Sequence, residues 1–326
     1  MAHQLATANG QVSMAYSEAG GVPWHGLGQQ LEAGLSIDEW TKAAGMDFEV
    51  LAKPVAYHPE ENGEHLLFDD HKVLYRSDTL TPLSVVSKKF RVVQPKEVME
   101  FYRELTETMG FTMETAGVLF DGRKYWAMAN IGQEAMIMDD SIKGYLMLGT
   151  SVDGTMATTC AYVSTRIVCA NTLGFAMQEV KEGRSKGVVK VTHRSHFDVD
   201  QVKAQLGIAS TSWDSFMKSV DVWSHTHVSP DAAKDYLTKF ANTRNADGEV
   251  ITSPRILKNL EELYNGAGKG SNMASAQGTV WGLINAVTEY VDHYRGRSED
   301  TRMDKAYFGD GVAIKERAVE LANELV

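Results

Sequence analysis

Residues 48–168 consist mainly of short stretches in which apolar and β-branched residues recur with the two-residue period of β-strands. The pattern predicts strands at 48–57, 66–68, 72–76, 83–93, 111–120, 124–131, 144–152 and 156–168. Two of the links between them, Asp121-Gly122 and Asp153-Gly154, are Asp-Gly pairs, the dipeptide that favours tight hairpin turns. The chain therefore predicts a mainly antiparallel sheet.

Helical spacing is found before this region and once within it. Ser36 followed by Glu39 predicts a capping box at the start of a short helix that ends at Gly45. Pro95 suits the first position of a second helix, which we expect to end before Gly110. After residue 171 a short helix to residue 180, a basic turn and a last strand at 188–193 are predicted.

From residue 198 the apolar residues recur every three or four positions, as in amphipathic helices. We predict helices at 199–206, 213–222, 230–241, 254–264, 274–294 and 312–325. Strands followed by helices predict an α+β fold, with an antiparallel β-rich N-terminal half containing one packed helix and an all-helical C-terminal half. The expected parts are a glycine-rich arm or covering loop at 1–35, anchored by Trp24, a β-rich core at 36–197, and a helical region at 198–326 packed on the core.

Composition narrows the class of protein. With 326 residues, 43% hydrophobic and 23% charged, the chain is typical of a globular protein. Its two cysteines, Cys160 and Cys169, cannot form a disulfide framework, and no secretory leader pattern opens the sequence, so we expect a reducing cytoplasm. The apolar stretches are too short to predict a membrane span.

Charge is unevenly distributed along the chain. The formal net charge of −11 argues against a uniformly basic nucleic-acid binder. Between residues 160 and 196, however, six cations stand against Glu179 and Glu182. These cations are Arg166, Lys181, Arg184, Lys186, Lys190 and Arg194. A local basic surface within an acidic protein is therefore expected.

Other cations lie beside aromatic residues in the predicted sheet. Lys88, Lys89 and Arg91 fall within the strand predicted at 83–93, where Lys89 and Arg91 would share a face. Arg123 and Lys124 adjoin a hairpin turn, next to Tyr125 and Trp126. Cations that follow phosphates and rings that stack on bases are what a single-stranded nucleic-acid surface needs. The alternative interpretation is that these residues belong to solvated strand faces and a polar turn. The predicted nucleic-acid contacts are Lys88, Lys89, Arg91, Arg123, Lys124, Tyr125, Trp126, Arg166, Arg184, Lys186, Lys190 and Arg194.

A second candidate site is a cleft for a small phosphorylated or carboxylated ligand. Arg166 would bind the anion, with Cys169 and Asn171 close in sequence and Glu289 and His293 from a later helix. Cys169 lacks an identifiable partner that would lower its pKa, which favours a structural cysteine.

That later helix carries a polar stripe at spacings of three and four. The stripe consists of Asn285, Thr288, Glu289 and Asp292. We expect it to bind the protein's own domain or a neighbouring subunit, because Glu289 with His293 provides too few ligands for a metal site. No metal, cofactor or catalytic residue is assigned.

Several blocks together resemble one known family. They are Pro23-Trp24-His25-Gly26-Leu27-Gly28, Ser84-Val85-Val86-Ser87, Val93-Gln94-Pro95, Glu114-Thr115-Ala116-Gly117, Leu148-Gly149-Thr150-Ser151, Arg166-Ile167-Val168-Cys169-Ala170-Asn171-Thr172-Leu173, and the run from Gly278 to Glu289. The chain resembles the phage/plasmid-like protein family with an LGT motif, domain of unknown function 932; Leu148-Gly149-Thr150 stands for the motif. The resemblance implies a phage, prophage or plasmid protein in a bacterial cytoplasm, and no particular activity. In outline the predicted fold is also similar to ring-forming single-strand annealing proteins.

We therefore expect a non-enzymatic nucleic-acid-binding protein of phage or mobile-element origin. It would bind or anneal single-stranded DNA in recombination or replication, through a basic groove formed in a homo-oligomer such as a ring. Two alternatives stay open, namely an enzyme acting at the Arg166/Cys169 cleft and an inhibitor that binds a host defence factor.

Overall fold

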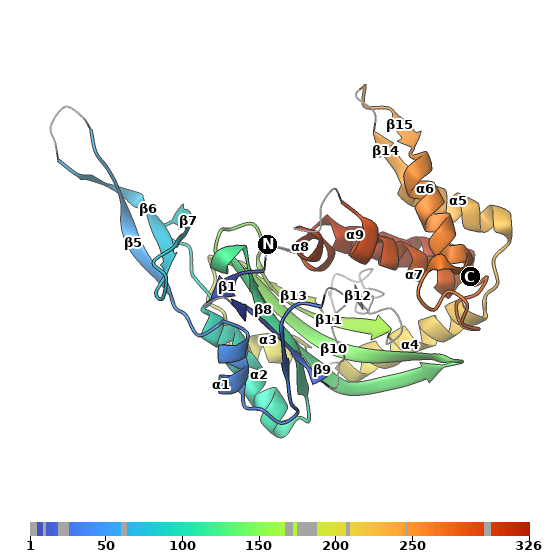
Figure 1. Cartoon of the computed structure of the whole chain (residues 1–326), viewed down its shortest axis with the longest axis horizontal. Helices are drawn as coiled ribbons and strands as arrows, with labels where there is room; N and C mark the ends of the chain where they lie inside the picture. The colour runs from blue at the N-terminus through green and yellow to red at the C-terminus, as the bar shows by residue number, and fades with distance from the viewer. Residues whose placement is uncertain are drawn as a thin grey trace. The chain divides into compact units, whose positions relative to one another are not determined.

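A computed structural model describes residues 5–8, 11–18, 26–59, 64–166, 172–174, 188–206, 209–244, 247–296 and 301–326. The fold is α+β: sheets form the N-terminal half and most helices lie in the C-terminal half, as predicted (Figure 1). By spatial contacts the chain divides into two compact units, one of residues 1–132, 146–161 and 188–207 and the other of the remaining residues. The units alternate along the chain, so the predicted boundaries after residues 35 and 197 stay a prediction.

The main sheet has the strand order β12-β11-β10-β9-β8-β3-β4, and β13 also pairs with β11. The strands are β3 (Met14–Ser17), β4 (Gln29–Leu31), β8 (Thr112–Leu119), β9 (Lys124–Ile137), β10 (Asp140–Ser151), β11 (Thr158–Arg166), β12 (Thr172–Gly174) and β13 (Val188–Val191). The β8–β9, β11–β12, β11–β13 and β3–β8 pairs are antiparallel, and β3–β4 is parallel. The expectation of an antiparallel sheet is thus right except at this edge.

Three connections come together at one end of the main sheet, which we call its turn end. Both predicted Asp-Gly turns lie there, one between β8 and β9 and the other between β10 and β11. Asp121 and Gly122 adopt φ values of 58° and 115°, which suit this dipeptide. Because β13 runs antiparallel to β11, it ends where β11 begins.

A second sheet has the order β5-β6-β7, with β5 at Val50–Tyr57, β6 at Leu66–Arg76 and β7 at Pro82–Ser87. β6 joins the two strands predicted at 66–68 and 72–76 through an irregularity, because the partners change from Pro54↔Lys72 to Val55↔Phe68. β5 and β6 form a ribbon that extends beyond β7 (Figure 1).

The strand predicted at 83–93 is too long. β7 ends at Ser87, where the Lys88 N–H donates to Asp70 O at 2.8 Å and the Phe90 N–H donates back to Ser87 O at 2.9 Å. The first bond continues the pairing with β6, and the second closes a turn. Lys89 and Arg91 therefore do not share a strand face, and their two-residue spacing has no structural meaning.

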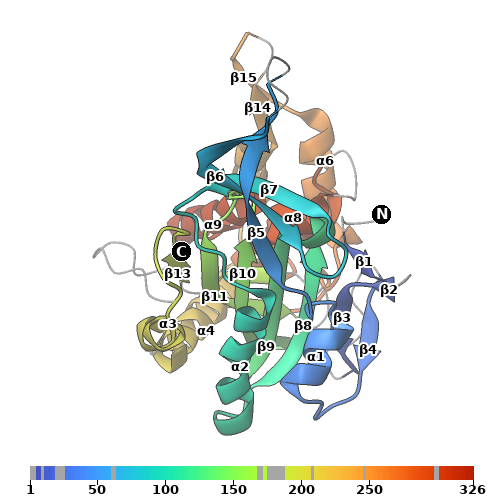
Figure 2. The ribbon, with the colours of Figure 1, turned by 90° about the vertical axis from the view of Figure 1, so that its left-hand side faces the viewer.

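Three helices of the first unit match the sequence analysis. α1 (Ile37–Ala43) begins with the predicted capping box, in which Ser36 Oγ accepts the Glu39 N–H and Glu39 accepts the Ser36 N–H. α2 (Pro95–Thr108) lies across one face of the main sheet (Figure 2), and its Tyr102 hydroxyl lies 2.7 Å from Ala127 O. α3 (Val199–Leu206) has the predicted bounds.

The second unit contains the other helices. They are α4 (Ala209–His225), α5 (Pro230–Ala241), α6 (Pro254–Glu262), α7 (Val280–Glu289), α8 (Arg302–Tyr307) and α9 (Asp310–Ala322), with π-helical turns at Leu263–Ala267 and Tyr290–Tyr294 and a 3-10 turn at Asn323–Leu325. A further 3-10 turn, Phe120–Gly122, belongs to the first unit. All ten residues of α7 are buried, and Trp281 stacks on Trp223 with centroids 6.1 Å apart. α7 begins six residues later than the predicted helix at 274–294, because Thr279 caps it after a series of turns.

The tip of the β9–β10 hairpin belongs to the second unit. Asp139 accepts the backbone N–H groups of Ala274 and Ser275 at 2.8 and 3.1 Å. Asp140, which is fully buried, accepts the Trp281 indole N–H at 3.0 Å. Asp139 thereby binds the turns that precede α7, and Asp140 binds the first turn of α7 itself.

Other segments differ from the sequence analysis. The expected N-terminal loop contains β1 (Thr7–Ala8), β2 (Gln11–Val12), β3 and β4, and its β3 is buried on the main sheet; Trp24 lies outside the described residues. Residues 172–174 are strand β12 rather than the start of a helix, and 175–180 lie outside the described part. The hairpin of β14 (Asn242–Arg244) and β15 (Val250–Thr252) was not predicted. Within the described ranges, no helix has both the length and the apolar character required to cross a bilayer.

Candidate nucleic-acid interface

Hydrogen bonds join four chain segments at the turn end of the main sheet. The Arg91 N–H donates to His193 O at 2.7 Å, which links the turn after β7 to the turn after β13. His193 Nε2 lies 2.8 Å from Met156 O in the β10–β11 connection. The Val152 N–H donates to Arg123 O at 2.8 Å, which adds the start of β9. Segments far apart in sequence thus form one surface within the first unit.

An aromatic contact reinforces these bonds. The rings of Phe90 and His193 stack with centroids 4.3 Å apart and an angle of 17° between their planes. The Lys72 ammonium donates to Phe90 O at 2.7 Å. The turn after β7 is therefore bound both to its own sheet and to the main sheet.

The charged residues that these segments expose to solvent are mainly cationic. Six exposed side chains form what we call the cationic cluster: Lys88, Lys89, Arg91, Arg123, Lys190 and Arg194. None of them forms an ion pair with another residue that the structure describes. Two carboxylates, Asp121 and Asp153, lie in the same turns, so positive charge predominates. Such a surface attracts polyanions.

The prediction that Lys124, Tyr125 and Trp126 face a ligand is wrong. Lys124 is 8% exposed, and each of the two rings is 1% exposed. The prediction assumed that β9 has one solvated face, but its first four residues are all buried, so both faces are covered here. A nearly continuous apolar run is typical of such a strand, and that signal is present from Tyr125 onward.

Specific packing explains the burial of both rings. The Tyr125 hydroxyl donates to Val93 O, and burial raises the pKa of this tyrosine well above its usual value. Trp126 lies opposite Gly117 on β8, where a Cβ would come within 2.5 Å of the indole. Gly117 therefore provides the space that Trp126 fills, and neither ring can stack on a base.

Several predicted contacts cannot be placed. The Arg166 side chain and the residues Cys169, Asn171, Arg184 and Lys186 lie outside the part of the chain that the structure describes. Of the basic segment at 160–196, the cationic cluster thus includes Lys190 and Arg194. Of the remaining predicted contacts, it includes Lys88, Lys89, Arg91 and Arg123.

The polar stripe of α7 contributes to the core of its own unit. Glu289 is 3% exposed, and its carboxylate oxygens accept the Lys269 N–H at 3.1 and 3.2 Å. Asp292 pairs with Lys315 at 2.8 Å, with both side chains buried. The interpretation that the stripe binds its own domain is therefore confirmed at these positions. His293 is half-buried, and the described residues contain no cluster of three or more metal-ligating side chains.

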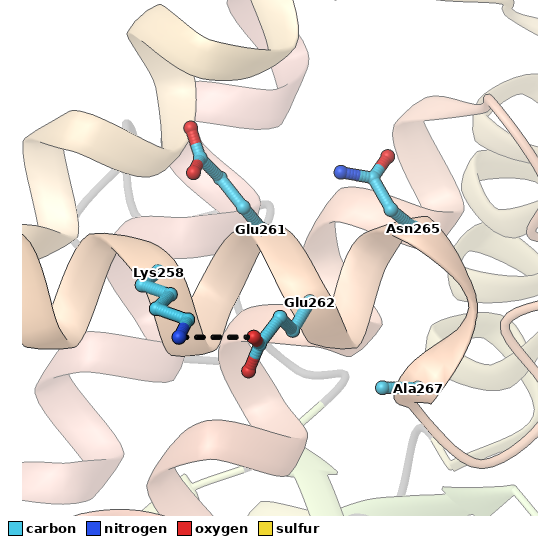
Figure 3. Close-up of a pocket in the computed structure, with 5 residues that line it drawn as sticks. All are labelled: Lys258, Glu261, Glu262, Asn265 and Ala267. Atoms are coloured by element: carbon cyan, nitrogen blue, oxygen red, sulfur yellow. Dashed lines mark ion pairs between the residues drawn. The ribbon is translucent and has the colours of Figure 1, made fainter.

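The Cys160 thiol and one surface hollow have few features of a catalytic or ligand-binding site. Cys160 is 1% exposed on β11, and burial raises the pKa of its thiol, which therefore stays protonated. A cavity of about 410 Å³ is lined by Lys258, Glu261, Glu262, Asn265 and Ala267 (Figure 3). Lys258 and Glu262 face each other at 3.7 Å, with 74% and 57% of their side chains exposed. This cavity is an open surface hollow, without the buried convergent polar groups of a ligand site.

Comparison with known proteins gives one match. The profile of the family described as "Domain of unknown function (DUF932)" matches residues 82–309, more than two-thirds of the chain. No curated protein and no solved structure matches. The matched range contains all six residues of the cationic cluster.

Proposed function

The chain belongs to this family of unknown function, DUF932, and from the cationic cluster we propose that it binds single-stranded nucleic acid without catalysing a reaction. The observation that carries the proposal is the grouping of six exposed cations, none paired with a described carboxylate, at one end of a sheet. Lysines and arginines that neutralise phosphates release condensed counterions, which drives binding.

The form of binding follows from which side chains are accessible. With Tyr125 and Trp126 buried, these rings cannot contribute the stacking energy that many single-strand binders use. Phosphate contacts position a strand but carry little sequence information. We therefore propose a surface that follows the backbone, with strong salt dependence and weak base preference.

The proposed biological setting comes from the resemblance of the sequence blocks. We place the protein in phages or other mobile elements, acting in a bacterial cytoplasm during recombination or replication. In a homo-oligomer, cationic clusters of neighbouring copies would form a longer path for the strand, while the acidic remainder of the surface keeps the assembly in solution.

The test is a salt titration of binding to a fluorescently labelled poly-dT oligonucleotide, followed by anisotropy. If all six cations contact phosphates, the slope of log Kobs against log salt should be about −4, because each contact contributes about −0.7 on a single strand. Replacing Lys88, Arg91, Arg123 and Arg194 together by Ala should weaken binding and make the slope shallower by about 3. The melting temperature should stay unchanged, because the four side chains are exposed.

The matched control is Lys258→Ala, which removes an exposed lysine of the second unit that is paired with Glu262. It should leave both affinity and slope as in the wild type. Binding that is insensitive to salt, or equally weakened by Lys258→Ala, would overturn the proposal.

A further inference from the structure

Phe90 is an aromatic residue that stands in the chain between two cations of the cationic cluster, Lys89 and Arg91. It is half-buried, whereas Tyr125 and Trp126 are 1% exposed. A ring beside cations combines the two parts of a single-strand site, because bases stack on rings while phosphates bind cations. Phe90 thus has the surroundings that the sequence analysis expected for Tyr125 and Trp126.

The ring of Phe90 is held from one side. One face stacks on His193, and no other ring among the residues that the structure describes stacks on the opposite face. His193 is itself fixed, because its Nδ1 lies 3.2 Å from Arg91 O and its Nε2 lies 2.8 Å from Met156 O. A ring oriented in advance loses little conformational freedom when a base binds to it.

The turn between β10 and β11 leaves space beside this ring. Gly154 is exposed, and a Cβ at this position would lie 4.0 Å from Cε2 of Phe90. A larger residue would therefore extend along the ring, which glycine leaves accessible. The φ of Gly154 is 75°, a value that also favours glycine, so the turn and the accessible ring need the same residue.

A second half-buried ring, Phe120, lies in the connection between β8 and β9. The Lys124 ammonium lies over this ring, 5.5 Å from its centroid, and the acidic Asp121 follows it in the chain. A carboxylate repels the phosphate that accompanies a base, whereas both chain neighbours of Phe90 are cations. The distribution of charge therefore favours Phe90.

We propose that Phe90 stacks on one unpaired base and thereby makes the cationic cluster select single strands. This inference rests on the proposed function, because the cluster has to bind the phosphates on either side of that base. Cations alone attract any polyanion, including a duplex, whose bases already stack on one another. Stacking accepts every type of base, so it adds a preference for single strands without a preference for sequence.

The test compares the labelled poly-dT oligonucleotide with an abasic oligonucleotide of the same length, which keeps the phosphates and lacks the bases. Anisotropy measures the binding of the full chain to both. Phe90→Leu should weaken binding to poly-dT about 5- to 150-fold, the loss of one stacked base, and should leave binding to the abasic strand unchanged. The slope of log Kobs against log salt should also stay unchanged, because all six cations remain.

Phe68→Leu is the matched control. Phe68 also stacks on a histidine, His71, with ring centroids 4.9 Å apart, but the acidic Asp69 and Asp70 follow it in the chain. This variant should bind both oligonucleotides as the wild type does. Phe90→Tyr keeps an aromatic ring and should retain the wild-type preference for poly-dT, which assigns a loss in Phe90→Leu to the ring.

The comparison separates this proposal from the proposed function. Equal weakening of both oligonucleotides by Phe90→Leu would overturn the stacking, because the ring would then only support its turn. A wild type that binds both strands equally well, with the salt slope expected of the cluster, would overturn the stacking alone, and so would an equal loss in Phe68→Leu. A wild type that binds neither strand would overturn the proposed function itself.

Discussion

The exposed cationic cluster of the first unit and the buried Lys315 of the second unit have opposite roles. The cationic cluster of the first unit is exposed and makes no ion pair with a described residue. In the second unit, Lys315 is 5% exposed and lies 2.8 Å from the equally buried Asp292. Exposed charges contribute little to stability and remain available to a ligand, whereas a buried charge depends on its partner. Stability and proposed binding thus depend on different cations, which mutation can separate.

The largest expected effect is the loss of one buried partner. Lys315→Met leaves the Asp292 carboxylate buried without its cation, so the free energy of unfolding should fall by about 3–5 kcal/mol. Urea denaturation followed by circular dichroism measures this. The double variant Asp292→Leu with Lys315→Met should recover most of the loss, because it removes both charges; a single variant as stable as the wild type would show that the pair has no such role.

A smaller effect is expected from the cap of α1 in the first unit. Ser36→Ala removes the Oγ that accepts the Glu39 N–H and should lower the free energy of unfolding by about 1 kcal/mol. Ser87→Ala, at an exposed strand end, is the control and should stay within about 0.5 kcal/mol of the wild type. Equal effects of the two variants would contradict the role of the cap.

The smallest expected effect on stability comes from an ion pair with one buried and one partly exposed partner. Arg76 is buried in the first unit and binds Asp78, and its hydrogen bonds hold the pKa of that carboxyl below the usual value. The stabilisation is fully present above the ordinary Asp pKa and is lost as the pH falls through the lowered pKa of the folded state. Because Asp78 is 39% exposed, the contribution should be below about 1 kcal/mol.

Asp78→Asn tests this in thermal melts. The variant should melt slightly below the wild type at neutral pH, and the difference should shrink as the pH falls below about 3.9. A difference that stays constant down to strongly acidic pH would exclude the ion pair as its cause.

Local signals in the sequence predicted much of the fold. The capping box at Ser36, both Asp-Gly turns and the bounds of α3 and α5 depend on nearest neighbours, and they are confirmed. The errors arise where distant residues decide the outcome. Alternation cannot tell whether one or both faces of a strand are covered, so the burial of Trp126 against Gly117 was not predicted.

In the candidate site, too, local sequence predicted some features and distant contacts decided the others. Charge counting identified Lys190 and Arg194 as exposed cations, but the strand assigned to Lys89 and Arg91 was wrong. What brings these residues to one end of the sheet is the bonding of Arg91 to His193, which are 102 positions apart. No local pattern contains that contact.

The hairpin tip at Asp139 and Asp140 constrains the order in which the chain can fold. Its partners Ala274, Ser275 and Trp281 lie 135 to 141 positions later. During synthesis the ribosome releases the hairpin long before these partners, so its two carboxylates stay solvated until residues 274–281 emerge. Contacts of such long sequence separation slow folding, and a nascent chain interrupted before residue 274 would lack the bonds that hold this turn.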